Sequence, residues 1–215
     1  MTKDPKVNDS GCAPESRRNL WLAVDVDGVL ADHVAHILPL LKRDYHFNAT
    51  VDEITAWDFP VSDTTFGAII RNKQCDAGFT LSIPVIADAR ASLKQLIASY
   101  NVAIVTARPP EADRWTLEWL RKKGIEFDFY ANLRVGAKHE TSFPCDVLID
   151  DYTANILAFL QHTEGCAILF SQPWNQERTE FKPYLESGRL RIAHNWPEIV
   201  SMIPAMFQGG GLTIR

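Results

Sequence analysis

Two aspartates, Asp25 and Asp27, directly follow an apolar run that extends from Leu20 to Val24. Gly28 comes next and permits a sharp turn of the chain. The apolar run is typical of a central strand in a parallel sheet, where both faces are buried. Ligands of such sheets bind outside the carboxyl ends of the strands, so the two carboxylates are candidates for chemistry at that edge.

Two later apolar runs, at 102–105 and 147–149, also end in polar residues. The residues that follow them are Thr106, Ala107 and Arg108, and Asp150 and Asp151. Carboxylates that cluster repel one another, and a site that holds several normally contains a cation such as Mg²⁺, which prefers oxygen ligands. An ammonium from Lys138, in a predicted loop, and a hydroxyl from Thr106 are suited to the charged oxygens of a phosphoryl group.

These residue types predict a covalent route for phosphoryl transfer. Asp25 is the candidate nucleophile, since carboxylates form acyl-phosphates in such reactions. Asp27 is placed to protonate the leaving oxygen and then to take a proton from the water that hydrolyses the intermediate. The pattern therefore predicts an Mg²⁺-dependent phosphomonoesterase, a hydrolase of phosphoric monoesters.

The elements that must position these residues alternate between strand and helix patterns from residue 85 onward, which predicts an α/β fold with a doubly wound, Rossmann-like parallel sheet. Residues 31–84 break this rhythm and predict a small helical cap insert, with a short helix at 51–54 capped from Thr50. The expected organisation is a disordered leader at 1–18, a core at 19–30 and 85–205, this insert, and a flexible tail at 206–215. Strands are expected at 20–24, 102–106, 127–130, 147–149 and 167–170, and helices at about 86–99, 152–162 and 197–202.

Composition sets further bounds. The chain has 215 residues with 46% hydrophobic content, enough for one core, and its net charge of -5 gives no general electrostatic affinity for nucleic acid. No apolar run approaches the roughly 18 to 20 residues of a membrane helix, so we expect no membrane partner and a cytoplasmic location. The four cysteines are scattered without metal-ligand spacing and are expected to be free thiols: Cys12, Cys75, Cys145 and Cys166.

Taken in order, four motifs resemble those of the haloacid dehalogenase superfamily of phosphatases, across residues 20–171. They are Asp25-Val26-Asp27-Gly28-Val29, Thr106-Ala107-Arg108, Lys138 and Ile149-Asp150-Asp151. The resemblance implies that Asp25 is the nucleophile and Asp27 the acid and base. It also implies that Thr106 and Lys138 hold phosphate, and that Mg²⁺ binds Asp25, the backbone carbonyl of Asp27, and Asp150.

Within that superfamily, three features are similar to the 5′(3′)-deoxyribonucleotidase family. These are the insert after the first motif, the segment from Thr50 to Phe59, and the turn from Phe170 to Asn175. This similarity implies a small phosphorylated substrate, a nucleoside or deoxyribonucleoside 5′- or 3′-monophosphate.

Two other functions stay open at this point. The strand-end motifs also resemble the polynucleotide 3′-phosphatase domain of end-healing enzymes, whose activity on oligonucleotides depends on salt. A non-catalytic phospho-acceptor or ligand-binding module would also combine acidic residues, threonine and lysine on a parallel sheet. In signalling receiver domains, however, the lysine comes last, whereas here an acidic pair follows Lys138.

Several residues have two interpretations. Lys138 either binds phosphate or is a solvated lysine, with Lys122 and Lys123 as weaker substitutes. Asp151 either binds metal or only orients the site. Arg108 is a further residue that could support the site. The aromatic residues of the insert either stack on a nucleobase or form its core: Trp57, Phe59 and Phe66. We interpret three histidines as ordinary surface or cap residues: His33, His36 and His46.

Overall fold

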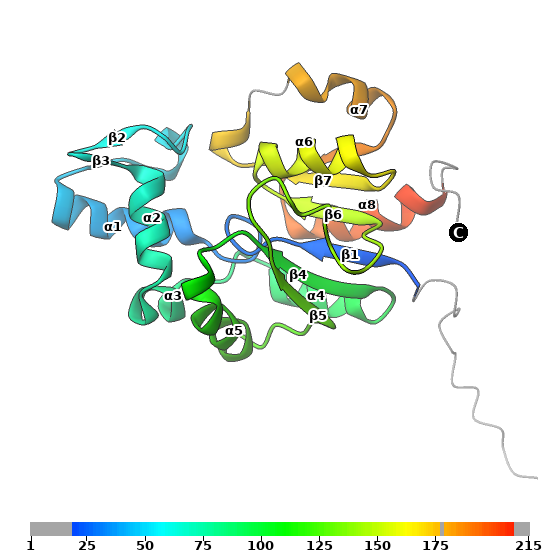
Figure 1. The fold of residues 1–215 in the computed structure, drawn as a ribbon, viewed down its shortest axis with the longest axis horizontal. Coiled ribbons are helices and arrows are strands. Elements are labelled where there is room, and N and C mark those ends of the chain that lie inside the picture. The colour runs from blue at the N-terminus through cyan, green and yellow to red at the C-terminus, as the bar shows by residue number, and fades with distance from the viewer. Residues whose placement is uncertain (1–18, 177–178, 209–215) are drawn as a thin grey trace, which may run out of the picture.

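The computed structural model describes residues 19–176 and 179–208, which form an α/β fold around a six-stranded parallel sheet (Figure 1). In sheet order the strands are β5 (Phe129–Asn132), β4 (Asn101–Thr106), β1 (Trp21–Val24), β6 (Val147–Asp150), β7 (Cys166–Phe170) and β8 (Leu190–Ala193). Every neighbouring pair is parallel. The predicted doubly wound sheet is confirmed, with the strand that precedes Asp25 near its centre.

Helices cover both faces of this sheet. Alternate residues of β1 point to opposite faces, so that Leu22 and Val24 join one core layer and Ala23 the other. The first layer includes side chains of α4 (Ala89–Ile97) and α8 (Trp196–Gln208), and the second includes those of α6 (Thr153–His162). The remaining core elements are η3 (Pro110–Ala112), α5 (Asp113–Lys122), η4 (Pro173–Asn175), η5 (Thr179–Phe181) and α7 (Lys182–Glu186).

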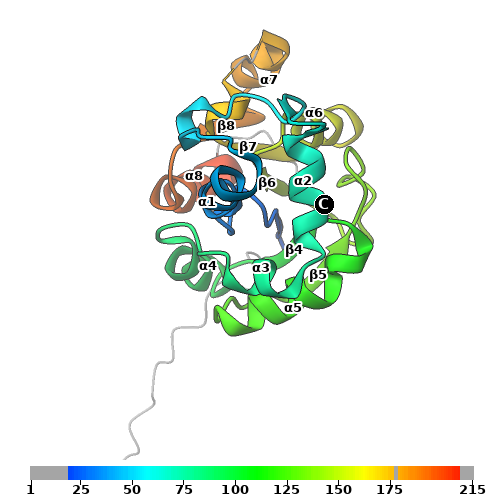
Figure 2. The same cartoon turned by 90° about the vertical axis from the view of Figure 1, so that its left-hand side faces the viewer.

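The segment between β1 and α4 lies beyond the carboxyl end of β1, on the left in Figure 1 and toward the viewer in Figure 2. Its elements are α1 (His33–Tyr45), η2 (Val51–Glu53), β2 (Pro60–Val61), β3 (Thr64–Thr65), α2 (Phe66–Gln74) and α3 (Ala77–Ser82). The short helix predicted after Thr50 is present as η2, and Thr50 and Glu53 form a capping box there. The antiparallel β2–β3 pair was not predicted, because two-residue strands are too short to show an alternating pattern.

Two adjacent chain segments join this insert to the core. Ala31 and Val85 form an antiparallel bridge, and Asp32 N donates to the Pro84 carbonyl at 3.0 Å. Ile86 N donates to the Leu30 carbonyl at 2.9 Å. The insert is therefore connected through a short two-stranded neck, directly after the turn that carries Asp27.

The C-terminal end differs from the expectation. Helix α8 continues to Gln208, and Met206 is buried against the core, so residues 206–208 do not belong to a flexible tail. The segment at 190–193 is the edge strand β8 of the same sheet. The expected leader at 1–18 and the rest of the tail at 209–215 lie outside the described residues. Across the described ranges, the structure contains no helix of the length and apolarity that a bilayer span requires.

Trp119 of α5 links the core to the end of the insert. It is fully buried, and its indole Nε1 donates to the Ile83 carbonyl at 2.9 Å. We expect Trp119→Phe to lower the free energy of unfolding by about 1–3 kcal/mol, because the buried carbonyl loses its partner. Urea denaturation measures the change. Leu117→Ala, at an exposed position of the same helix, is the control and should stay within about 0.5 kcal/mol. Equal effects of the two substitutions would contradict this role.

Candidate active site

The end of β1 places two carboxylates at one edge of the sheet. Asp25 N donates to the Ile149 carbonyl at 2.9 Å, which keeps Asp25 in register beside β6. The chain then turns, because the amides of Leu30 and Ala31 both donate to the Val26 carbonyl. This compact turn leaves the side chain of Asp25 buried at the edge of the sheet.

Gly28 allows this turn to contact the second acidic motif directly. Its φ is +73°, and a Cβ atom there would lie 2.1 Å from Asp151 Oδ2. The Gly28 carbonyl accepts a hydrogen bond from Gln172 Nε2 at 2.7 Å. Only glycine fits both the backbone angle and the close approach, so the first and last motifs pack against each other at this residue.

Three buried carboxylates meet at this edge. Ligand atoms from Asp25, Asp150 and Asp151 all lie within 4.8 Å of one another. Lys138 contacts two of them, since its Nζ donates to Asp25 Oδ1 and to Asp150 Oδ2, both at 2.6 Å. The sequence placed all four residues at the site, and the fold brings them together. Lys122 is instead an exposed lysine that pairs with Glu118, so it does not replace Lys138.

Burial dominates the electrostatics of this cluster. Desolvation, with smaller contributions from the neighbouring carboxylates, raises the pKa of Asp25 to about 7 against the opposing attraction of Lys138. Desolvation and the charge of Asp150 also raise the pKa of Asp151 well above its ordinary value. Burial alone would lower the pKa of Lys138, but Asp150 and Asp25 outweigh it and raise that pKa. The single positive charge of Lys138 thus does not balance the three carboxyl groups of this cluster.

Asp27 has a different environment, dominated by one guanidinium. Arg108 Nη2 donates to Asp27 Oδ1 at 2.6 Å and Arg108 Nε donates to Oδ2 at 2.8 Å. Burial would raise the pKa of Asp27, but the charge and hydrogen bonds of Arg108 outweigh burial and lower it. Gln74 Nε2, from the insert, donates to Oδ2 at 2.8 Å, and His33 Nδ1 lies 3.8 Å from Oδ1. Arg108 therefore favours the ionised form of Asp27 over its protonated form.

Residues from α6 and from the turn after β7 fix the second acidic pair. Asn155 Nδ2 donates to Asp150 Oδ2 at 3.0 Å, while its Oδ1 accepts from Gly136 N in the loop that carries Lys138. Trp174 Nε1 donates to Asp151 Oδ2 at 2.8 Å, and Asn175 Nδ2 donates to the Asp151 carbonyl at 2.7 Å. These hydrogen bonds are the contacts expected if Asp151 orients the site.

A pocket of about 180 Å³ opens between this edge and the insert. Asp25, Asp27 and Asp151 line it together with Ala107 and Arg108. Thr106 is fully buried at the end of β4, where its Oγ1 accepts from Arg108 N at 3.3 Å. The residues that line the pocket do not include Thr106, Lys138 or Asp150, which lie behind its wall.

The aromatic residues of the insert divide between the pocket and the insert core. Trp57 lines the pocket and stacks on His33, with ring centroids 5.4 Å apart. Phe59 and Phe66 stack on each other at 4.9 Å, Phe66 is fully buried, and neither lines the pocket. For these two phenylalanines the structure favours the core interpretation.

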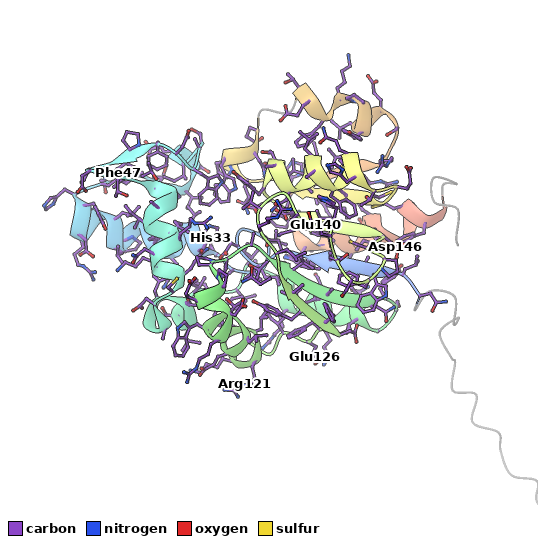
Figure 3. All side chains as sticks on the ribbon, viewed as in Figure 1. His33, Phe47, Arg121, Glu126, Glu140 and Asp146 are labelled. Carbon is purple, nitrogen blue, oxygen red and sulfur yellow. The ribbon has the colours of Figure 1, made fainter. Side chains whose placement is uncertain are left out.

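Sequence reasoning missed two residues that approach Asp27. His33 was interpreted as a surface or cap residue, but it is buried beside Asp27 and Trp57, and Figure 3 shows it between the insert and the sheet. Its position just after the first motif was an available signal. The sequence contains no such signal for Gln74, because a glutamine in an amphipathic helix is ordinarily an exposed residue. His46 is exposed, as expected.

Comparison with known proteins places the chain in a family. Residues 18–208 match the family described as 5′ nucleotidase, deoxy (pyrimidine), cytosolic type C protein. The chain belongs to this nucleotidase family. It is therefore an enzyme of the phosphatase class, nucleotidase-like and of the haloacid dehalogenase type, as the motifs implied. A search among curated proteins finds no match.

Solved structures of this nucleotidase's fold include a haloacid dehalogenase-like hydrolase from Streptococcus pneumoniae, with 15% identity and a TM-score of 0.55. That comparison covers 86% of this chain and 98% of the other. A haloacid dehalogenase-like hydrolase from Xanthomonas campestris has 13% identity and a TM-score of 0.58, over 91% of this chain and 100% of the other. At these identities the likeness establishes the shared fold alone.

Gly28→Ala tests the close packing of the two acidic motifs. The new methyl group would collide with Asp151, so we expect a loss of stability larger than the roughly 1–2 kcal/mol that a left-handed backbone costs a non-glycine residue. Gly188→Ala is the matched control, because Gly188 has a φ of +76° and nothing within 4 Å of the added atom. Thermal and urea unfolding would compare the two. A loss at Gly28 no larger than at Gly188 would show that the site tolerates the methyl group.

Proposed function

We propose that this nucleotidase-like phosphatase is an Mg²⁺-dependent phosphomonoesterase that hydrolyses nucleoside monophosphates through an aspartyl-phosphate intermediate. One observation carries the proposal. Lys138 joins Asp25 to Asp150 across two strand ends, while Asp27, two residues after Asp25, is held separately by Arg108. One carboxylate is thus available as nucleophile and a second for proton transfer, next to a place for a cation.

The donor set fits Mg²⁺. Asp25, Asp150 and Asp151 offer hard carboxylate oxygens, which suit this ion, within 4.8 Å of one another. Lys138 is the single cationic partner that these three carboxylates have among the described residues. We assign Asp25, Asp150 and the backbone carbonyl of Asp27 as ligands, with Asp151 orienting the site. The bound ion would supply positive charge that balances the carboxylates and the phosphoryl oxygens.

Asp25 and Asp27 divide the chemistry. Arg108 favours the ionised form of Asp27 in the free protein, so Asp27 first takes up one proton from solvent as the substrate binds. A carboxylate oxygen of Asp25 then forms a bond to phosphorus as the ester P–O bond breaks, and Asp27 donates that proton to the leaving oxygen. Water then attacks the aspartyl-phosphate, Asp27 takes the proton of that water, and the P–O bond to Asp25 breaks. Inorganic phosphate is released, Asp27 gives the proton from that water back to solvent, and both aspartates return to their starting states.

The phosphoryl group needs donors as well as a nucleophile. We assign this role to the hydroxyl of Thr106, the backbone at Ala107 and the ammonium of Lys138, which lie at or just behind the pocket wall next to Asp25. Their donors would stabilise the negative charge of the phosphoryl oxygens.

The substrate class follows from the insert and from family membership. The insert adds Trp57, Ile70 and Arg71 to the pocket wall, and a flat ring such as Trp57 suits a nucleobase. A pocket bounded by the insert favours a mononucleotide over a polynucleotide. Three cysteines of the described residues are free thiols: Cys75, Cys145 and Cys166. Free thiols are typical of a reducing compartment, so we include in this proposal the cytosolic location that the family's description gives.

Phosphate release from ribo- and deoxyribonucleoside monophosphates, sugar phosphates and a 3′-phosphorylated oligonucleotide tests the function. We expect release that is concentrated on mononucleotides and lost with a chelator. Asp25→Asn should lower kcat by at least about 10³-fold, because the amide is a poor nucleophile, while circular dichroism stays unchanged. Full activity of this variant would refute the covalent mechanism. Preferred release from the oligonucleotide, weakened by salt, would instead favour a polynucleotide phosphatase.

Mg²⁺ should stabilise the folded protein, because the ion binds a site that the unfolded chain lacks. At about 100 times its Kd it would add about 2.7 kcal/mol, enough to raise Tm by several degrees. Differential scanning calorimetry with and without MgCl₂ measures the shift. Asp150→Asn should abolish it, whereas Asp52→Asn, at an exposed aspartate of the insert, should preserve it. A shift that survives Asp150→Asn would place the ion elsewhere.

A further inference from the structure

Gln74 of the insert donates a hydrogen bond to Asp27, the carboxylate assigned to proton transfer. It ends α2, is 94% buried and lines the pocket, and its Nε2 donates to Asp27 Oδ2 at 2.8 Å across 47 positions of sequence. Its backbone is also held, since Thr80 Oγ1 donates to the Gln74 carbonyl at 2.8 Å. A buried amide in this position is either a structural bridge or a part of the reaction site.

The hydrogen bonds of Asp27 decide between these roles. An ionised carboxylate accepts at about four lone-pair positions, two on each oxygen. Oδ2 has two donors, Arg108 Nε and Gln74 Nε2, so both of its positions are occupied. Within residues 19–176 and 179–208, Oδ1 has one donor at hydrogen-bond distance, Arg108 Nη2, and the nearby His33 Nδ1 is 3.8 Å away. One lone-pair position of Oδ1 is therefore left for a proton.

We propose that Gln74 is a positioning residue that makes Oδ1 the proton-transferring oxygen of Asp27 by occupying Oδ2. The inference rests on the proposed function, in which Asp27 donates a proton to the leaving oxygen and later takes one from water. Without Gln74, the proton can reside on either oxygen, and the carboxyl group can rotate away from the leaving group. The loss then falls on steps that need proton transfer.

This bond also makes the acid respond to the insert. Arg108 lies in the core beside Thr106 and stays next to Asp27 wherever the insert moves, because its Nη1 also donates to Thr116 Oγ1 of α5 at 3.1 Å. Gln74 belongs to the insert, which reaches the core through the neck at Ala31 and Val85. Withdrawal of the insert would remove the Gln74 donor alone. The acid is thus fully oriented only when the insert covers the pocket.

The test uses two substrates that differ in their need for an acid. The leaving group of a nucleoside monophosphate is an alkoxide, which needs a proton. The leaving group of p-nitrophenyl phosphate is a stabilised phenolate, which does not. Gln74→Met keeps the length of the side chain and removes the donor. The hydrolysis of the aspartyl-phosphate is common to both substrates, so the comparison uses kcat/KM, which reports on formation of that intermediate. We expect kcat/KM for the nucleotide to fall by about tenfold or more, out of the roughly 10²–10⁴-fold that general acid catalysis contributes, and kcat/KM for p-nitrophenyl phosphate to change less than about twofold.

Two further variants complete the experiment. Gln74→Glu keeps the shape but sets a second carboxyl group against Asp27, so it should fail to restore the nucleotide activity. Asn72→Ala, at an exposed position of the same helix, should leave both activities unchanged. Equal losses on the two substrates, or no loss on either, would overturn the positioning role while the phosphatase function stands. A native protein that releases no phosphate from any substrate would overturn the proposed function itself, and this inference with it.

Discussion

The repulsion among three buried carboxylates is the constraint on which the rest of the site depends. Two like charges about 4 Å apart at an effective dielectric of about 20 repel by about 4 kcal/mol, a large part of the stability of a domain. Asp25, Asp150 and Asp151 lie within such distances, and burial denies them water. Lys138 offsets part of this repulsion by binding two of the three, and the deficit that remains is the reason why a divalent cation belongs in the proposal.

Many of the surrounding contacts serve to keep this costly arrangement in place. Asn155 ties the Lys138 loop to Asp150, and Trp174 and Asn175 hold Asp151 from the other side. Gly28 lets the first motif approach the last with no side chain between them. The charged groups are thus set by rigid elements before substrate arrives, which is the arrangement that electrostatic stabilisation of a transition state requires.

The two carboxylates of the first motif differ because their neighbours differ. Asp25 faces other carboxylates and has a raised pKa, whereas Asp27 faces Arg108 and has a lowered one. Two residues of one turn therefore have different electrostatic environments, which their tertiary contacts set. The insert also reaches this turn, because Gln74 of α2 donates a hydrogen bond to Asp27.

The sequence by itself determined the sheet and the edge at which the chemistry lies. Apolar runs that end in Asp25, Thr106 and Asp150 required parallel strands, and parallel strands bring their carboxyl ends together, so the core of the site followed from local pattern alone. The order of the motifs also indicated Lys138, but only the fold shows that it is buried against Asp25 and Asp150. The end of α8 at Gln208 and the β2–β3 pair of the insert were not determined in this way, because contacts with distant residues decide them.

Tertiary structure alone decided which residues surround the acidic turn. Gln74 and His33 reach Asp27 from the insert, while Phe59 and Phe66 turn into the insert core instead of the pocket. A glutamine or a phenylalanine on an amphipathic helix has the same local pattern in either place. Its role depends on which surface the helix packs against, and that is set by the neck between Ala31 and Val85 and by long-range packing.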